Sequence, residues 1–158
     1  MDYHYGLHIR WTGNLGTGTS SYREYSREHE ISAEGKQTMI CSSDPHFRGD
    51  SKLYNPEEFL LSSVSTCHML WYLHFCADNG IIVERYEDKP TGTMITDKTG
   101  YGKFTEIILH PEIWIKDIEG KEMAIQLHEE AHHFCFIANS CNFPILIQQL
   151  RKVLRMMV

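Results

Sequence analysis

One long segment, NPEEFLLSSVSTCHMLWYLHFCADNG at residues 55–80, constrains the fold of this chain more than any other. Asn55 is a favourable N-cap and Pro56 suits the first position of a helix, so a helix is expected to begin here. The interior is apolar on nearly every face, and Gly80 can adopt the left-handed conformation that ends a helix. Helices that are apolar on all sides are usually central and covered by other elements. The sequence therefore predicts a central helix over residues 55–79.

The rest of the chain contains strand-like segments and one further helix. The second helix is predicted over residues 121–140, where apolar residues recur at helical spacing. The expected strands are residues 3–11, 22–31, 36–43, 81–88, 91–97, 103–116 (interrupted at Pro111) and 141–150. This order predicts a single α+β domain over residues 1–158, in which two central helices are covered by antiparallel β-sheets.

Composition and charge exclude several classes of function. The net charge is −6, whereas non-specific binding of nucleic acid requires a basic surface. The first residues lack the basic start and apolar run of a secretory signal, and no apolar stretch is long enough to span a bilayer. We therefore expect a cytoplasmic protein that binds neither nucleic acid nor membrane. In that reducing compartment the five cysteines would be free thiols, metal ligands or redox-active residues.

The string HEEAH at residues 128–132 matches the H-E-x-x-H pattern of zinc hydrolases. On a helix it would place His128 and His132 on one face, with Glu129 available as a general base. The longer form of the motif needs a glycine and a third histidine downstream, and neither follows here. Because only the short form of the motif is present, a zinc hydrolase is kept as an alternative and is not the leading interpretation. In the simpler interpretation these residues line the exposed side of a half-buried helix, with Glu129 and Glu130 in solvent.

Two cysteines suggest a different chemistry. Cys67 lies in the predicted central helix, where a lone cysteine is usually an inert core residue. However, the small polar run SSVST directly precedes it and leaves room for a substrate, and Cys135 lies in the second predicted helix. Two thiols that meet between packed helices would be able to reduce a peroxide. One thiolate attacks the O–O bond and becomes a sulfenic acid, and the other thiol converts it to a disulfide.

Four segments resemble the OsmC/Ohr family, which comprises osmotically induced proteins and organic hydroperoxide resistance proteins. NPEEFLLSSVSTCHM is similar to the family's cysteine-bearing helix, and HEEAHHFCFIANSCNFP is similar to its second helix. GIIVERYEDKPTGTM resembles the strand pair between them, and WTGNLGTGTSSY resembles the glycine-bearing first hairpin. The resemblance extends over about residues 5–147 and includes two cysteine-bearing helices in the family's order. It identifies the chain as a divergent OsmC-like member, in which H-E-x-x-H is a coincidence.

The resemblance implies an OsmC-like fold, an interlocked homodimer and a thiol-dependent peroxidase that acts on organic hydroperoxides without a metal or bound organic cofactor. Cys67 matches the peroxidatic cysteine, Cys135 the resolving cysteine, and Glu57 the glutamate that orients an active-site arginine. That arginine is expected to be Arg48, with Arg23 as the second choice. The reductant would be a dithiol, often one that bears a lipoyl group.

Helix geometry adds one inference about this site. Glu57 precedes Cys67 by ten residues, which span about 15 Å of helix, so the two cannot touch within one straight helix. We therefore expect a site that two chains of a dimer share.

Three departures from the family pattern are visible. Phe136 follows Cys135 where many members have proline, His68 follows Cys67 where an apolar residue is common, and Cys141 is a further thiol able to act as the resolving partner. These differences leave open a second interpretation, in which the same dimer binds a ligand at the thiols without turnover.

Overall fold

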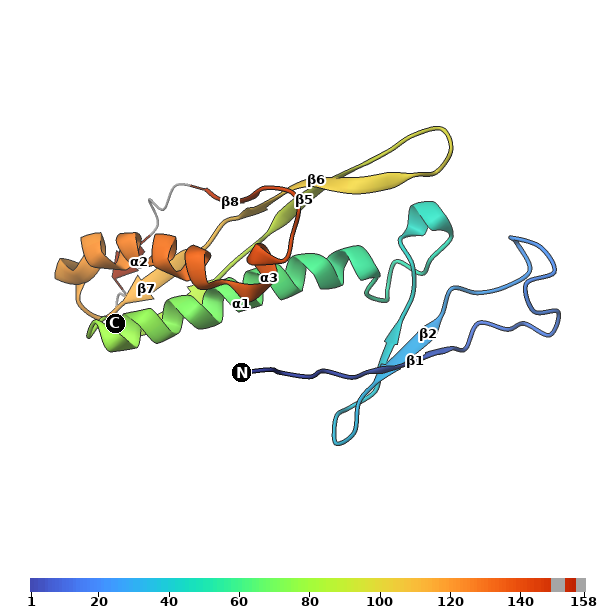
Figure 1. Ribbon diagram of the computed structural model, residues 1–158, viewed down its shortest axis with the longest axis horizontal. Coiled ribbons are helices and arrows are strands. Elements are labelled where there is room, and N and C mark those ends of the chain that lie inside the picture. Colours follow the sequence, from blue (N-terminus) through green and yellow to red (C-terminus); the bar gives the residue numbers. More distant parts are fainter. Residues whose placement is uncertain (149–152, 156–158) are drawn as a thin grey trace. The chain divides into compact units, whose positions relative to one another are not determined.

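The computed structural model of the protein describes residues 1–148 and 153–155 (Figure 1). The chain forms two compact units, Met1–Leu60 and Leu61–Val158. The single domain expected over residues 1–158 stays a prediction. None of the helices in the described part of the chain is long and apolar enough to cross a membrane.

The first unit contains a small antiparallel sheet in the order β1-β2-β3. Its strands are β1 (His8–Trp11), β2 (His29–Ser32) and β3 (Met39–Cys41), which are shorter than the sequence predicted. The loop between β1 and β2 is held by Arg27, whose guanidinium lies 4.2 Å from the ring centre of Tyr22 and 4.1 Å from that of Tyr25. A single turn of 3-10 helix, η1 (Pro45–Phe47), precedes α1.

Helix α1 (Pro56–Asp78) confirms the helix that the sequence predicted over residues 55–79. Asn55 and Glu58 form a reciprocal capping box. The Glu58 amide donates to Asn55 Oδ1 at 2.9 Å, and the Asn55 amide donates to Glu58 Oε2 at 3.1 Å. Beyond the helix, Gly80 adopts a φ of 70°, as expected for a left-handed cap.

The second unit contains two three-stranded sheets, in the orders β4-β7-β9 and β5-β6-β8. Their strands are β4 (Val83–Glu87), β5 (Thr91–Thr96), β6 (Gly102–Leu109), β7 (Glu112–Ile115), β8 (Ile145–Ile147) and β9 (Val153–Arg155). The expectation of antiparallel sheets is wrong for these two, because β8 pairs with β6 and β9 pairs with β7 in parallel. Parallel neighbours need a long crossover, and the segment that carries the second helix supplies it. Residues 149 and 150 of the predicted last strand lie outside the described ranges.

The long strand predicted over residues 103–116 is two strands in two different sheets. Proline has no amide hydrogen to donate to a sheet ladder, so pairing stops before Pro111. The amide of His110 instead donates to Asp88 Oδ1 at 2.7 Å, and Ser65 on α1 donates to Asp88 Oδ2 at 2.5 Å. Asp88 thus connects the strand break to α1.

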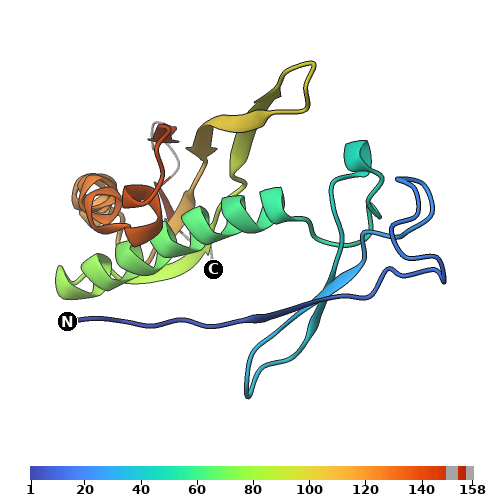
Figure 2. The ribbon, with the colours of Figure 1, turned by 45° about the vertical axis from the view of Figure 1, so that its right-hand side comes forward.

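The second predicted helix is divided in two. Helix α2 (Lys121–Phe134), which follows the 3-10 turn η2 (Ile118–Gly120), ends where Cys135 takes an extended conformation with φ −66° and ψ 104°. A short helix, α3 (Phe136–Asn139), then follows. Helices α1 and α2 lie side by side (Figure 2). One core joins them to β7 and β9, built from Tyr72, Cys76, Ile113, Ile115, Ala124, Leu127, Ala131 and Val153.

Candidate functional site

The thiols of Cys67 and Cys135 meet where α1 packs against the α2–α3 junction. Cys135 is fully buried, and its Sγ lies 3.9 Å from the carbonyl oxygen of Val64 on α1. Burial raises the pKa of the Cys135 thiol to about 12, and a hydrogen bond with the neighbouring Cys67 thiol adds to the rise. Both cysteines are free thiols. The structure therefore brings together the two cysteines that the sequence singled out.

The break between α2 and α3 determines where the Cys135 thiol lies. Cys135 ends α2, with its amide donating to the His132 carbonyl oxygen at 3.3 Å. Its Sγ accepts a hydrogen bond from the Ala138 amide at 3.5 Å and so caps the first turn of α3. A continuous helix over residues 121–140, as predicted, would not place Cys135 at the end of one helix with its sulfur capping the next.

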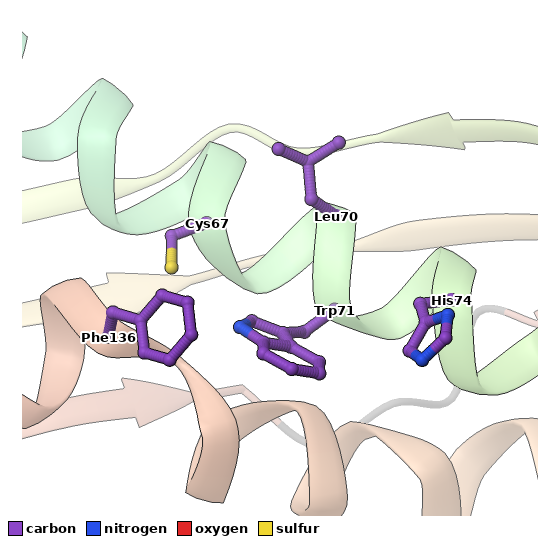
Figure 3. A pocket seen from close by; sticks show the side chains of 5 residues that line it. All are labelled: Cys67, Leu70, Trp71, His74 and Phe136. Carbon is purple, nitrogen blue, oxygen red and sulfur yellow. The ribbon is translucent and has the colours of Figure 1, made fainter. Parts of the chain in front are cut away.

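Cys67 is partly exposed at one end of an apolar pocket. The pocket has a volume of about 350 Å³ and is lined by Cys67, Leu70, Trp71, His74 and Phe136. Figure 3 shows the Cys67 sulfur on the same side of α1 as the Trp71 ring, with the Phe136 ring beside both. The Trp71 and Phe136 rings meet nearly at right angles, with centres 5.4 Å apart. One thiol is thus accessible from an apolar cavity while its neighbour is shielded.

Sequence reasoning did not find the walls of this pocket. Phe136 was noted only as a departure from the family pattern, and Trp71 was one apolar residue among many in the central helix. The available signal was spacing, since Cys67, Leu70, Trp71 and His74 recur every three or four residues on one face of α1.

A buried pair of histidines lies beside the thiols. His68 Nε2 is 2.9 Å from His128 Nδ1, both residues are 1% exposed, and the His128 ring stacks on Tyr72 with centres 3.8 Å apart. Burial lowers the pKa of His68 to about 4, with His132 contributing, and lowers that of His128 to about 3, with His68 contributing. Both rings are therefore neutral near pH 7.

This pair overturns the interpretation that the H-E-x-x-H residues line the exposed side of a helix. His128 faces the interior of the α1–α2 interface, where its ring contacts that of His68 on α1. Glu129 and Glu130 are exposed, as expected. Within residues 1–148 and 153–155, no group of three or more His, Cys, Asp or Glu side chains is arranged to hold a metal ion. The zinc hydrolase alternative therefore gains no support from the geometry.

The two candidate arginines and Glu57 belong to the first unit. Arg48 directly follows η1 and is exposed, with a φ of 68°; it is the sole non-glycine residue with positive φ in the described ranges. Arg23 is exposed in the loop between β1 and β2. Glu57 lies in the first turn of α1, and its buried Oε2 has no hydrogen-bond partner among the described residues. A buried carboxylate oxygen of this kind is suited to accept from a basic side chain.

The other three cysteines have separate environments. Cys41 and Cys76 are buried, and burial raises the pKa of both thiols. Cys141 is partly exposed, and its Sγ lies 3.3 Å from the carbonyl oxygen of Ile137. The structure thus places Cys141 close to α3, while Cys135 is the thiol that contacts Cys67.

Comparison with known proteins identifies the family of the chain. The sequence model of the family described as OsmC-like protein matches residues 49–149, so the chain belongs to the OsmC-like protein family. A solved OsmC-like protein of unknown function from Vibrio cholerae superposes with a TM-score of 0.80 at 24% identity, over 93% of this chain and 99% of that one.

Two further solved structures share the fold. An OsmC-like protein from Mycoplasma pneumoniae gives a TM-score of 0.70 at 16% identity, over 99% of this chain and all of that one. An organic hydroperoxide resistance protein from Elizabethkingia anophelis gives a TM-score of 0.66 at 18% identity, over 99% of this chain and 100% of that one. At these identities the likeness establishes the α+β, OsmC-like fold alone. No curated protein sequence matches the chain.

Proposed function

We propose that the protein is a thiol-dependent peroxidase that reduces organic hydroperoxides, with Cys67 as the peroxidatic and Cys135 as the resolving cysteine. The observation that carries the proposal is the pairing of one thiol at an apolar pocket with a second, fully buried thiol in contact with it. Apolar walls favour an organic hydroperoxide over hydrogen peroxide, because burial of the organic group contributes to binding.

The first step takes place at Cys67. Its thiolate sulfur attacks the outer oxygen of the hydroperoxide, and the O–O bond breaks as the S–O bond forms. The organic part leaves as an alkoxide and takes up a proton to become an alcohol. Cys67 is then a sulfenic acid, oxidised by two electrons.

The second step uses the neighbouring thiol. The Cys135 sulfur attacks the sulfenic sulfur, an S–S bond forms, and the hydroxyl group leaves with the Cys135 proton as water. Because burial holds Cys135 protonated before this step, its sulfur is protected from direct attack by oxidants. An external dithiol, which in this proposal is lipoyl-bearing or similar, returns both cysteines to thiols and becomes a disulfide.

The remaining site residues come from the family resemblance. Arg48, or Arg23 in its place, would stabilise the Cys67 thiolate and the peroxide oxygens, and Glu57 would hold the arginine through a charge-assisted hydrogen bond. The buried, unpartnered Oε2 of Glu57 supports that role. We propose that the site is completed in a homodimer, and that the protein acts in the cytoplasm in defence against oxidative stress.

The decisive experiment is mass spectrometry of the reduced protein after one equivalent of cumene hydroperoxide, with hydrogen peroxide for comparison. We expect a rapid loss of about 2 Da, mapped to a Cys67–Cys135 disulfide and faster with the organic peroxide. A Cys67–Cys141 disulfide would keep the activity but reassign the resolving residue. An unchanged mass over minutes would contradict the peroxidase and favour the alternative of an OsmC-like dimer that binds a ligand at the thiols without turnover.

Variants separate the two cysteine roles. Cys67→Ser should abolish oxidation, whereas Cys135→Ser should stop at a sulfenic acid that dimedone traps at Cys67. Cys76→Ser is the control, because it removes the second thiol of α1, which is buried and lies outside the pair.

A further inference from the structure

The pocket at Cys67 has polar groups at both ends and apolar walls between them. Cys67 and His74 are seven residues apart on α1, which corresponds to a separation of about 10 Å along the helix. Leu70, Trp71 and Phe136 complete the lining, and the Trp71 ring lies between Cys67 and His74 (Figure 3). A ligand whose peroxide reacts at Cys67 therefore extends its far end towards His74.

The walls favour a flat, aromatic ligand. The Trp71 and Phe136 rings meet at 79°, so an aromatic ring that stacks on one presents its edge or face favourably to the other. The pocket volume of about 350 Å³ is sufficient for a single aromatic ring such as that of cumene hydroperoxide.

The far end of the pocket offers no net positive charge. His74 Nε2 lies 3.5 Å from Asp78 Oδ2, so the pair carries a net charge of zero when the imidazole is protonated and of −1 when it is neutral. Neither the pocket lining nor any position of α1 is a lysine or arginine. The C-terminal end of α1, where Asp78 lies, adds the partial negative charge of the helix dipole. A carboxylate at this end would meet negative potential.

We infer that this site selects uncharged aromatic hydroperoxides, and that the His74–Asp78 pair discriminates against substrates that carry a carboxylate at the end remote from the peroxide. The inference rests on the proposed peroxidase function and adds the class of substrate to it. His74 and Asp78 act here as specificity-determining residues and take no part in breaking the O–O bond.

The test compares two matched substrates, the 4-carboxylate derivative of cumene hydroperoxide and the methyl ester of that derivative. Their kcat/KM values are measured near neutral pH with dithiothreitol, an uncharged reductant. We expect the acid to be reduced about fivefold less efficiently than the ester, because its carboxylate is repelled by that of Asp78 at an exposed end of the pocket, where water and salt weaken the repulsion. An acid that is reduced as well as or better than the ester would overturn the inference.

Variants show whether the named pair causes the preference. The quantity compared is the kcat/KM of the acid divided by that of the ester, measured for each variant. A general loss of activity lowers both values equally and leaves this ratio unchanged. Asp78→Asn should raise the ratio about threefold, whereas His74→Gln should lower it because it leaves the Asp78 carboxylate without its basic partner. Asp97→Asn, the same substitution in the β5–β6 turn, is the control and should leave the ratio unchanged. Equal shifts in Asp78→Asn and Asp97→Asn would mean that net charge alone sets the preference.

The outcome remains decidable if neither compound is reduced. The proposed function would then fail, and the pocket would be tested with the two corresponding alcohols, through the NMR shift of the Trp71 indole N–H, assigned by its loss in Trp71→Phe. A shift with the ester alcohol and none with the acid alcohol would support the uncharged aromatic ligand. Equal shifts, or none, would overturn it.

Discussion

His68 Nε2 lies 2.9 Å from His128 Nδ1 in the α1–α2 interface, one residue beyond the thiol of Cys67. The other ring nitrogens, His68 Nδ1 and His128 Nε2, are buried without a partner among the described residues. Such a pair costs free energy to bury and contributes mainly by fixing how the two helices align. Its neutrality makes the fold sensitive to acid.

The first prediction concerns stability at low pH. The folded-state pKa values of about 4 for His68 and about 3 for His128 lie below the ordinary value of 6.5, so the unfolded chain binds more protons as pH falls below that value. Each histidine should remove about 2 kcal/mol of unfolding free energy between pH 7 and pH 5. Urea unfolding at several pH values measures this loss. The double variant His68→Leu/His128→Leu should flatten the curve, and an unchanged slope would contradict the assignment.

The second prediction concerns the coupling between these two histidines. Removing one ring leaves the other nitrogen buried without a partner, so each single leucine variant should lose about 1–3 kcal/mol of unfolding free energy at pH 7. The double variant should lose less than the sum of the singles, with a coupling of about 1 kcal/mol or more. Additive losses in the double-mutant cycle would show that the 2.9 Å contact contributes nothing.

The third prediction concerns thiol reactivity. Because burial raises the pKa of Cys135 to about 12, and Cys67 is the partly exposed member of the pair, iodoacetamide near pH 8 should alkylate Cys67 in the native protein and leave Cys135 unmodified. Peptide mapping after brief labelling distinguishes the two. In urea both cysteines should react at similar rates. Labelling of native Cys135 as fast as Cys67 would mean that the junction between α2 and α3 is open in solution.

The fourth prediction separates Arg48 from Arg23. Arg48 has a φ of 68°, a conformation that costs a side-chain-bearing residue about 1 kcal/mol and that glycine adopts readily. Arg48→Gly should therefore keep or slightly raise the unfolding free energy while lowering kcat/KM with cumene hydroperoxide at least tenfold. Arg23→Ala is the companion variant. A large loss of activity there, with Arg48→Gly active, would assign the role to Arg23.

The sequence was informative where local chemistry decides the structure. Asn55, Pro56 and Gly80 marked both ends of α1, because caps act through neighbouring backbone groups. The pairing of Cys67 with Cys135 followed from the family resemblance. The parallel partners of β6 and β7 were missed, since β8 and β9 are short and their pairing depends on contacts distant in sequence.

Two features of the site could not be predicted from the local sequence. The break at Cys135 is not marked by glycine or proline, and it places the thiol where it both contacts α1 and caps α3. The burial of His128 depends on His68, which lies sixty residues away in the sequence. Helical periodicity does not identify these two histidines as partners. Periodicity gives the face of a helix, but only tertiary packing shows which polar residue a partner can satisfy.

The parallel pairing of β6 with β8 has a consequence for biosynthesis. Ile107 pairs with Ile145, so this sheet is incomplete until the ribosome has passed residue 145. The segment between them carries Cys135, which is synthesised long after Cys67. Contacts between residues so far apart in sequence form late, because closing a long loop costs entropy before it brings any gain. The nascent chain therefore exposes Cys67 without its partner until the segment that contains Cys135 has been synthesised and has packed against α1.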